Sequence, residues 1–107
     1  MPLTRSFKET VKADLESSPD FRRALLREAI GAMLAGDVDT GKSVLRQYIN
    51  GTVGFVQLGT ALDRSPKALM RMFSEAGNPQ AKNLFEIVAY LQKIDGTRLE
   101  VVDRSAA

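Results

Sequence analysis

The chain of 107 residues contains no cysteine, no histidine and no tryptophan. The lack of cysteine excludes disulfides and a thiolate nucleophile, and the lack of histidine excludes the usual zinc sites and histidine-based acid–base catalysis. No apolar run approaches the ~18 residues that a membrane-spanning helix needs, and the charged first residues are unlike a signal peptide. We therefore expect a cytoplasmic protein that is not an enzyme and that needs no cofactor, metal or membrane.

What the chain does contain is typical of one folded domain, residues 1–107. Hydrophobic residues make up 44% of it and charged residues 26%, which is ordinary for a globular protein. The formal net charge is only +2, but the charge is unevenly distributed. From Arg64 to Lys82 the basic residues outnumber the single acid, Glu75. Such a local basic face indicates contact with phosphate, although an ordinary solvated surface has the same composition.

Apolar periodicity and capping residues predict three helices in the N-terminal half, residues 6–50. Ser18 is placed to N-cap the second of them, with Pro19 at its first position and Gly36 just after its end. Asp37 or Asp39 is placed to cap the third. The first two predicted helices cover residues 6–16 and about 19–35, and the third ends at about residue 50.

The stretch 54–91 predicts three more short helices, within a core that extends over residues 52–94. Two of them are expected to begin at Ser65-Pro66 and Asn78-Pro79, because each pair combines an N-cap with a first-turn proline. The predicted fold class is all-α, with about six short helices. The apolar stripes are Phe55, Leu58 and Leu62, then Leu69, Met72 and Phe73, then Leu84, Ile87, Val88 and Leu91.

The first two of these helices are joined so closely that they must cross at a steep angle, with the third covering their shared apolar side. That arrangement is a lambda-repressor-like helix-turn-helix. Gly59 falls where the two helices come closest, and Asp63 falls where the turn needs a left-handed residue. Leu69 falls where the second helix enters the core.

Residues 98–102 are predicted to form a short β-strand, because Leu99 and Val101 alternate with Arg98 and Glu100. No other segment has the pattern of a strand. A symmetry-related copy in a dimer is therefore the expected pairing partner, and a frayed tail is the alternative. Residues 103–107 are expected to be disordered.

Residues 36–43, GDVDTGKS, match the P-loop pattern G-x-x-x-x-G-K-[ST] at every position. A phosphate-binding loop needs a buried strand before it, however, and the preceding residues here have helical periodicity. The loop would also direct Asp37 and Asp39 at a polyphosphate. We expect a junction between two helices rather than a nucleotide site.

The second helix of a helix-turn-helix lies in the DNA major groove, with its N-terminal residues at base edges. Arg71 suits a guanine edge or a phosphate, and Lys67 suits phosphate. Met70 lies off the apolar stripe, where it either meets a thymine methyl group or is simply exposed. The start of the next helix either binds a phosphate or faces solvent. The candidate DNA-binding residues are Arg64, Ser65, Lys67, Ala68, Met70, Arg71, Ser74, Gln80, Lys82 and Asn83.

At these residues the chain also resembles a known family. The run 54–101, with SPKALMRMFSEAGNPQAKNLFEIVAYLQ and GTRLEV, resembles the Cro/repressor-type (Xre-like) helix-turn-helix proteins. More narrowly, it resembles the addiction-module antidote proteins related to HigA. The resemblance implies a recognition helix over residues 66–75, a homodimer, and an operator of two half-sites about one helical turn apart. It also implies a RelE-type toxin as partner and repression of a shared operon.

The sequence thus predicts a sequence-specific DNA-binding transcriptional regulator, the antitoxin and autorepressor of a toxin–antitoxin operon. A stand-alone repressor without a toxin fits the same residues. The alternative is a protein–protein interaction module, toxin-neutralising or regulatory, that keeps the fold without specific DNA binding. An enzyme has only the P-loop match and scattered carboxylates without a partner base in its favour.

Overall fold

The computed structural model describes residues 10 and 12–105, and this part of the chain is all-helical. A short helix covers residues 12–17, and five further helices follow it. None of the described residues forms a β-strand. The predicted all-α class with about six helices is confirmed. The five helices are α2 (Pro19–Leu34), α3 (Val38–Gly51), α4 (Gly54–Leu62), α5 (Pro66–Met72) and α6 (Ala81–Asp95).

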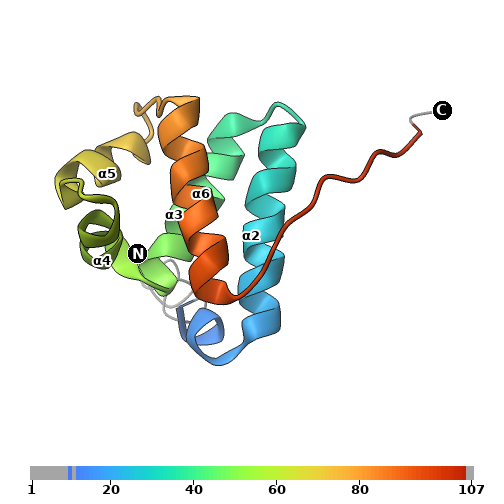
Figure 1. Ribbon diagram of the computed structural model, residues 1–107, viewed down its shortest axis with the longest axis horizontal. Coiled ribbons are helices and arrows are strands. Elements are labelled where there is room, and N and C mark those ends of the chain that lie inside the picture. The colour runs from blue at the N-terminus through green and yellow to red at the C-terminus, as the bar shows by residue number, and fades with distance from the viewer. Residues whose placement is uncertain (1–9, 11, 106–107) are drawn as a thin grey trace.

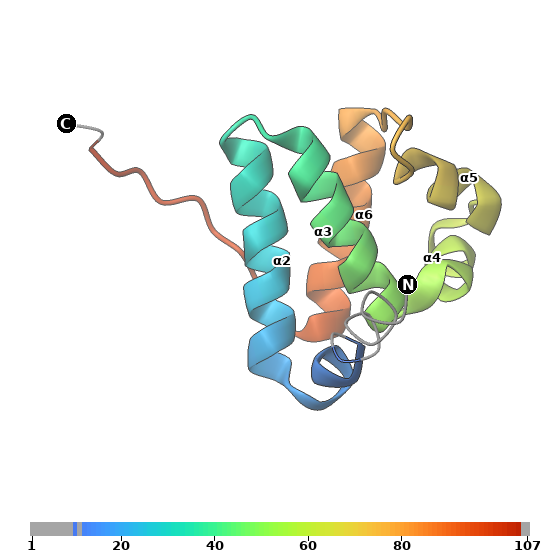
Figure 2. The same ribbon diagram turned by 180° about the vertical axis from the view of Figure 1, so that it is seen from behind.

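The helices divide into a body of long elements and a smaller unit at one side. α2 and α3 run antiparallel to each other, and α6 runs beside α2 (Figure 1). The short helices α4 and α5 lie at the side of the molecule opposite α2, as both views show (Figures 1 and 2). α5 is therefore at the outer edge of the fold. We call residues 12–17 with α2, α3 and α6 the body, and α4 with α5 the α4–α5 unit.

One cluster of buried apolar side chains connects all of the described helices. Within this cluster the ring of Phe55 on α4 meets the ring of Phe73 at the end of α5, with centroids 5.9 Å apart at a tilt of 52°, a favourable aromatic geometry. Because both parts share one core, packing against the body fixes the position of α5. The cluster includes Leu15, Leu26, Leu45, Phe55, Leu69 and Ile87, one from each helix.

The helix starts follow the predicted capping chemistry at three places. Ser18, Asp37 and Ser65 each accept a hydrogen bond from the backbone N–H three residues later, at 3.2, 3.3 and 3.4 Å. Each bond satisfies a donor that the first helical turn leaves without a partner. Gly36 has a φ of +89°, the left-handed conformation expected after α2.

Two predicted boundaries in the second half of the chain are wrong. α5 ends at Met72 rather than at residue 75, and α6 begins at Ala81 instead of after Asn78-Pro79. Gly77 lies against the last turn of α5, where a Cβ would meet the carbonyl oxygens of Arg71 and Met72. The chain turns back against the end of α5 at this point, so residues 73–80 are irregular.

The predicted strand at residues 98–102 is not found in the single chain, where these residues have no regular secondary structure, and its pairing with a second copy stays a prediction. Leu99 packs against the core, but the residues after it extend away from the helices (Figures 1 and 2). A strand needs a hydrogen-bonded neighbour, and the described helices provide none. Disorder at residues 103–107 stays a prediction, because residues 103–105 are exposed and residues 106–107 lie outside the described residues. Residues 6–9 and 11 of the predicted first helix also lie outside the described residues.

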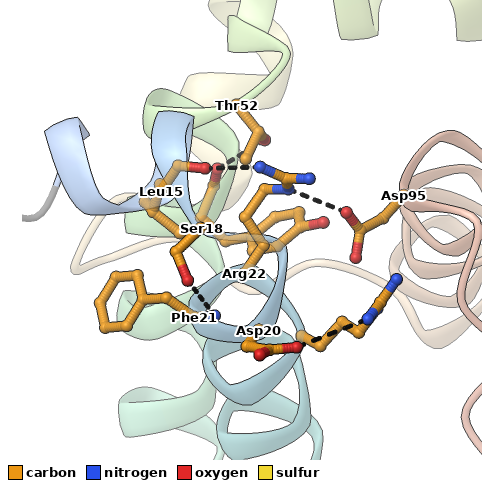
Figure 3. Close-up of polar contacts among 9 residues, drawn as sticks. Leu15, Ser18, Asp20, Phe21, Arg22, Thr52 and Asp95 are labelled. Carbon is orange, nitrogen blue, oxygen red and sulfur yellow. Dashed lines mark hydrogen bonds and ion pairs between the residues drawn. The ribbon is translucent and has the colours of Figure 1, made fainter.

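A buried ion pair fastens α2 to the end of α6 within the body (Figure 3). Arg22 Nε donates to Asp95 Oδ1 at 2.9 Å, and a second guanidinium nitrogen donates to the carbonyl of Leu15 at 2.9 Å. The Asp95 side chain is only 3% exposed, and its Oδ2 has no hydrogen-bond partner. Three segments of the body therefore meet at one guanidinium group.

Candidate nucleic-acid interface

The turn between α4 and α5 has the geometry that its sequence predicts. Asp63 adopts the left-handed conformation, with φ 55° and ψ 50°. It is the only non-glycine residue with a positive φ in the described part of the chain. This conformation reverses the chain, so the N–H of Arg64 donates to the carbonyl of Gly59 at 2.8 Å. Three residues, 63–65, are enough to join the two helices.

Gly59 is the point of closest approach between the two helices. A Cβ placed there would lie 2.5 Å from the carbonyl oxygen of Arg64 and 3.4 Å from the ring of Pro66. The glycine thus lets α5 begin directly against α4. One turn further along α5, Leu69 is fully buried in the core. These contacts fix the direction of α5 and decide which of its faces is exposed.

The outer face of α5 carries Lys67, Met70 and Arg71, and all three are exposed. Met70 is 48% exposed, although it is one of the most apolar residues of the helix. Lys67 and Arg71 lie four residues apart, so their side chains project from the same side of the helix. None of the described acidic residues forms an ion pair with either of them. Both cations are available to an external anion.

The other candidates near α5 have more local roles. The Ser65 hydroxyl oxygen caps α5, and the half-buried Ser74 hydroxyl donates to the carbonyl of Arg71 at 2.7 Å. Ala68 is half-buried and donates its backbone N–H to the Ser65 cap. These residues shape the helix ends, and they sit beside the outer face without adding charge to it.

Arg64 faces α6 instead of solvent. A guanidinium nitrogen donates to Asn83 Oδ1 at 2.7 Å and lies 3.5 Å from a carboxylate oxygen of Glu86. The pair connects the turn before α5 to α6, so Arg64 and Asn83 position the unit. No local pattern in the sequence indicates that Glu86 lies near Arg64, which is 22 positions away.

Gln80 and Lys82 stand at the exposed start of α6. Gln80 is the N-cap residue, but its side chain makes no capping hydrogen bond. The first-turn amides of α6 therefore have no side-chain cap from Gln80, and Lys82 belongs to this same first turn. This helix start is separated from the outer face of α5 only by the irregular residues 73–80 (Figure 1).

Lys42, the lysine of the P-loop match, binds backbone carbonyl oxygens of its own chain. Its residue is 5% exposed, and its ammonium donates to the carbonyls of Gly77 at 2.7 Å and Glu75 at 3.2 Å. A helix, α2, precedes the motif in place of a strand, and Asp37 caps α3. The motif is a helix junction whose lysine holds the segment after α5. The signal that could have revealed this is the helical spacing of Lys42 to Leu45 and Ile49, which are both buried.

A pocket of about 310 Å³ lies where the body meets the start of α4, lined among others by Tyr48, Gln57 and Asp95. Burial raises the pKa of the Tyr48 phenol to about 12, with a further contribution from the nearby carboxylate of Asp95 and an opposing one from Arg22. No cluster of three or more acidic residues in the described chain is placed to hold a metal ion. Nor is any helix there long and apolar enough to cross a bilayer.

Comparisons of the chain with protein-family models, with curated proteins and with solved structures gave no match.

Proposed function

We propose that the protein is a sequence-specific DNA-binding regulator in which the α4–α5 unit is a helix-turn-helix and α5 enters the major groove. The observation that carries the proposal is the combination of a three-residue turn through a left-handed Asp63 with an outer face of α5 that bears two unpaired cations. A helix in the major groove needs base-reaching side chains on its outer face and apolar anchors on its inner face. Leu69 supplies such an anchor.

Within this proposal, Arg71 contacts a guanine edge or a phosphate, Lys67 contacts a phosphate, and Met70 lies against a thymine methyl group. The start of α6, with Gln80 and Lys82, binds the phosphate backbone next to the groove. Arg64 and Asn83 hold the turn in place through their mutual hydrogen bond. Ser65, Ala68 and Ser74 set the ends of α5.

The biological setting extends the same proposal. The resemblance of residues 54–101 to addiction-module antidote proteins supports a cytoplasmic antitoxin that represses its own operon and binds a RelE-type toxin. Such a regulator acts as a homodimer on two half-sites about one helical turn apart. A stand-alone repressor uses the same interface without the toxin.

The test is fluorescence anisotropy with a labelled duplex from upstream of the protein's own gene, beside a scrambled duplex of equal length and composition. We expect a preference of ~10³ or more for the native duplex, with affinity that falls steeply as salt rises, because phosphate contacts release counterions. Equal and weak binding of both duplexes would discard the autorepressor.

A protein–protein interaction module is the second candidate, and exposed apolar side chains favour it. Val56 on α4 is 69% exposed and Phe85 on α6 is 63% exposed, outside any DNA contact proposed above. Where exposed apolar side chains form a contiguous patch, that patch is typical of a surface covered by a partner protein. Weak, unspecific DNA binding together with tight binding of the product of a neighbouring gene, lost on Phe85→Ser, would establish this function instead.

A further inference from the structure

The segment after α6 presents one free backbone edge. The N–H of Leu99 donates to Gln92 Oε1 at 2.8 Å, and this bond ties the start of the segment to α6. Beyond it, residues 100–105 are exposed and extend from the molecule (Figures 1 and 2). Val101 is 84% exposed and Val102 is 75% exposed. We call residues 98–105 the C-terminal arm.

The bond from Leu99 decides which edge of the arm is free. In an extended chain successive N–H groups point to opposite edges. Since the N–H of Leu99 faces α6, those of Glu100, Val102 and Arg104 face the other edge. No hydrogen bond from the described chain reaches the backbone of residues 100–105. Unpaired edges of this kind are templates for another extended chain.

From this geometry we infer that the arm pairs with the arm of a second copy as an antiparallel two-stranded ribbon whose twofold axis passes through Val102. Residues that face each other across such a ribbon turn the same edge to their partner. Even-numbered residues therefore face even-numbered residues, and the axis passes through a residue instead of between two.

Charge then selects the residue on the axis. An axis at Glu100 sets two glutamates face to face, and an axis at Val101 sets Arg98 against the partner's Arg104. An axis at Val102 pairs Glu100 with the partner's Arg104 twice and sets the two Val102 side chains between these pairs. Opposite charges and aliphatic side chains at facing positions both stabilise a ribbon.

An axis at Leu99 also matches charge, because Arg98 then faces the partner's Glu100. That ribbon would be formed by residues 97–101. Thr97 and Leu99 among them are half-buried and already hydrogen-bonded to the end of α6. The ribbon about Val102 uses residues 99–105, which extend beyond the helices (Figure 1). We therefore assign the axis to Val102.

A two-stranded ribbon alone is marginally stable in water. The dimer is therefore weak for the free protein, and DNA with two half-sites strengthens it by bringing two copies together. This inference supplies the dimer of the proposed function, but the arms can pair whether or not α5 binds DNA. Its test uses no DNA, so the two can fail separately.

The test is disulfide trapping in the full chain, which has no cysteine of its own. Val101 faces the partner's Asp103 at a non-hydrogen-bonded position, where the Cβ atoms lie about 5 Å apart, close to the separation that a disulfide bridges. We expect Val101→Cys mixed with Asp103→Cys to give a covalent dimer under mild oxidation, and neither variant alone to do so. Cross-linking of Val101→Cys with Thr97→Cys instead would overturn the Val102 axis, and no excess of dimer in any mixture would overturn the pairing.

Charge reversal at Glu100 and Arg104 is a second test of the pairing. Both side chains are exposed, so we expect these substitutions to leave the fold intact. Arg104→Glu places like charges opposite each other at two sites, and we expect it to slow cross-linking roughly tenfold. Adding Glu100→Arg restores opposite charges and the original rate. Arg98→Glu is the matched control, because Arg98 lies outside the central pairs; a loss with this variant and none with Arg104→Glu contradicts the inference.

Discussion

The body and the α4–α5 unit are held together in different ways. In the body a charged pair joins distant segments, because Arg22 meets Asp95, and Lys42 connects the body to the carbonyls after α5. Within the α4–α5 unit the two helices approach through the backbone, at Gly59 and at the left-handed Asp63, and one charged side chain, Arg64, holds the turn to α6. The exposed side chains on the outer face of α5 therefore make none of the contacts that hold the fold together. Its side chains can serve recognition, and they can change without loss of the fold.

The largest expected effect comes from closing the gap at Gly59. Gly59→Ala places a Cβ 2.5 Å from the backbone carbonyl oxygen of Arg64 and 3.4 Å from the ring of Pro66, which leaves little room for relaxation. We expect a loss of about 3 kcal/mol or more in the free energy of unfolding, measured by urea denaturation. The control is Gly31→Ala on α2, where a Cβ meets nothing within 4 Å. It should raise stability by up to about 1 kcal/mol.

The body is most sensitive at Arg22. Arg22→Ala removes the partner of a carboxylate that is 3% exposed, which leaves the charge of Asp95 buried and unpaired. The expected loss is about 3 kcal/mol in the free energy of unfolding. Arg23→Ala, which removes an exposed pair with Asp20, should change stability by less than about 0.5 kcal/mol. Equal effects of the two substitutions would mean that the buried pair does not hold the body together.

Lys42 connects the two parts, and its loss should affect both. Lys42→Met keeps the aliphatic stem but leaves the carbonyls of Glu75 and Gly77 without their donor. We expect a loss of about 2 kcal/mol in stability, together with faster amide hydrogen exchange in residues 73–77. Arg46→Met, on the exposed side of α3, is the matched control. A rise in the melting temperature with ATP, lost in Lys42→Met, would instead revive nucleotide binding.

The smallest expected effect is a pH dependence from Tyr48. Its pKa is about 12 in the folded chain against 10.0 as the ordinary value, so the unfolded chain ionises first as pH rises. Stability from this group is complete below pH 10 and falls between pH 10 and about 12. At pH 11 the loss is roughly 1.4 kcal/mol. Tyr48→Phe should lack this component, so the stability difference between the two proteins should change by that amount between pH 9 and pH 11.

The parts of the structure that depend on neighbouring residues could be predicted from the sequence. Ser18 and Ser65 cap helices, Asp63 is left-handed, and Leu69 is buried, because each depends on a few residues nearby. The contact of Arg22 with Asp95 spans 73 positions and leaves no local signal. The wrong start of α6 has the same origin: the proline at position 79 permits a helix, but contacts with Lys42 and the end of α5 keep the chain irregular up to Gln80.

The candidate interface divides along the same line. Exposure of Lys67, Met70 and Arg71 follows from the apolar stripe of α5, and the sequence was sufficient to predict it. The engagement of Arg64 with Asn83 and Glu86 depends on how α6 crosses the turn, which no local pattern specifies. Whether the outer face binds DNA remains a prediction of function.

The measurement that tests this account most directly compares DNA binding by two double variants of equal charge. Lys67→Ala with Arg71→Ala removes the cations of the outer face of α5, and Arg27→Ala with Arg46→Ala removes two exposed cations of the body. In anisotropy titrations with the upstream duplex, the first variant should lose the preference over a scrambled duplex, roughly 10³-fold, and the second should keep it. Equal losses for the two variants, or none for the first, would show that α5 does not read DNA.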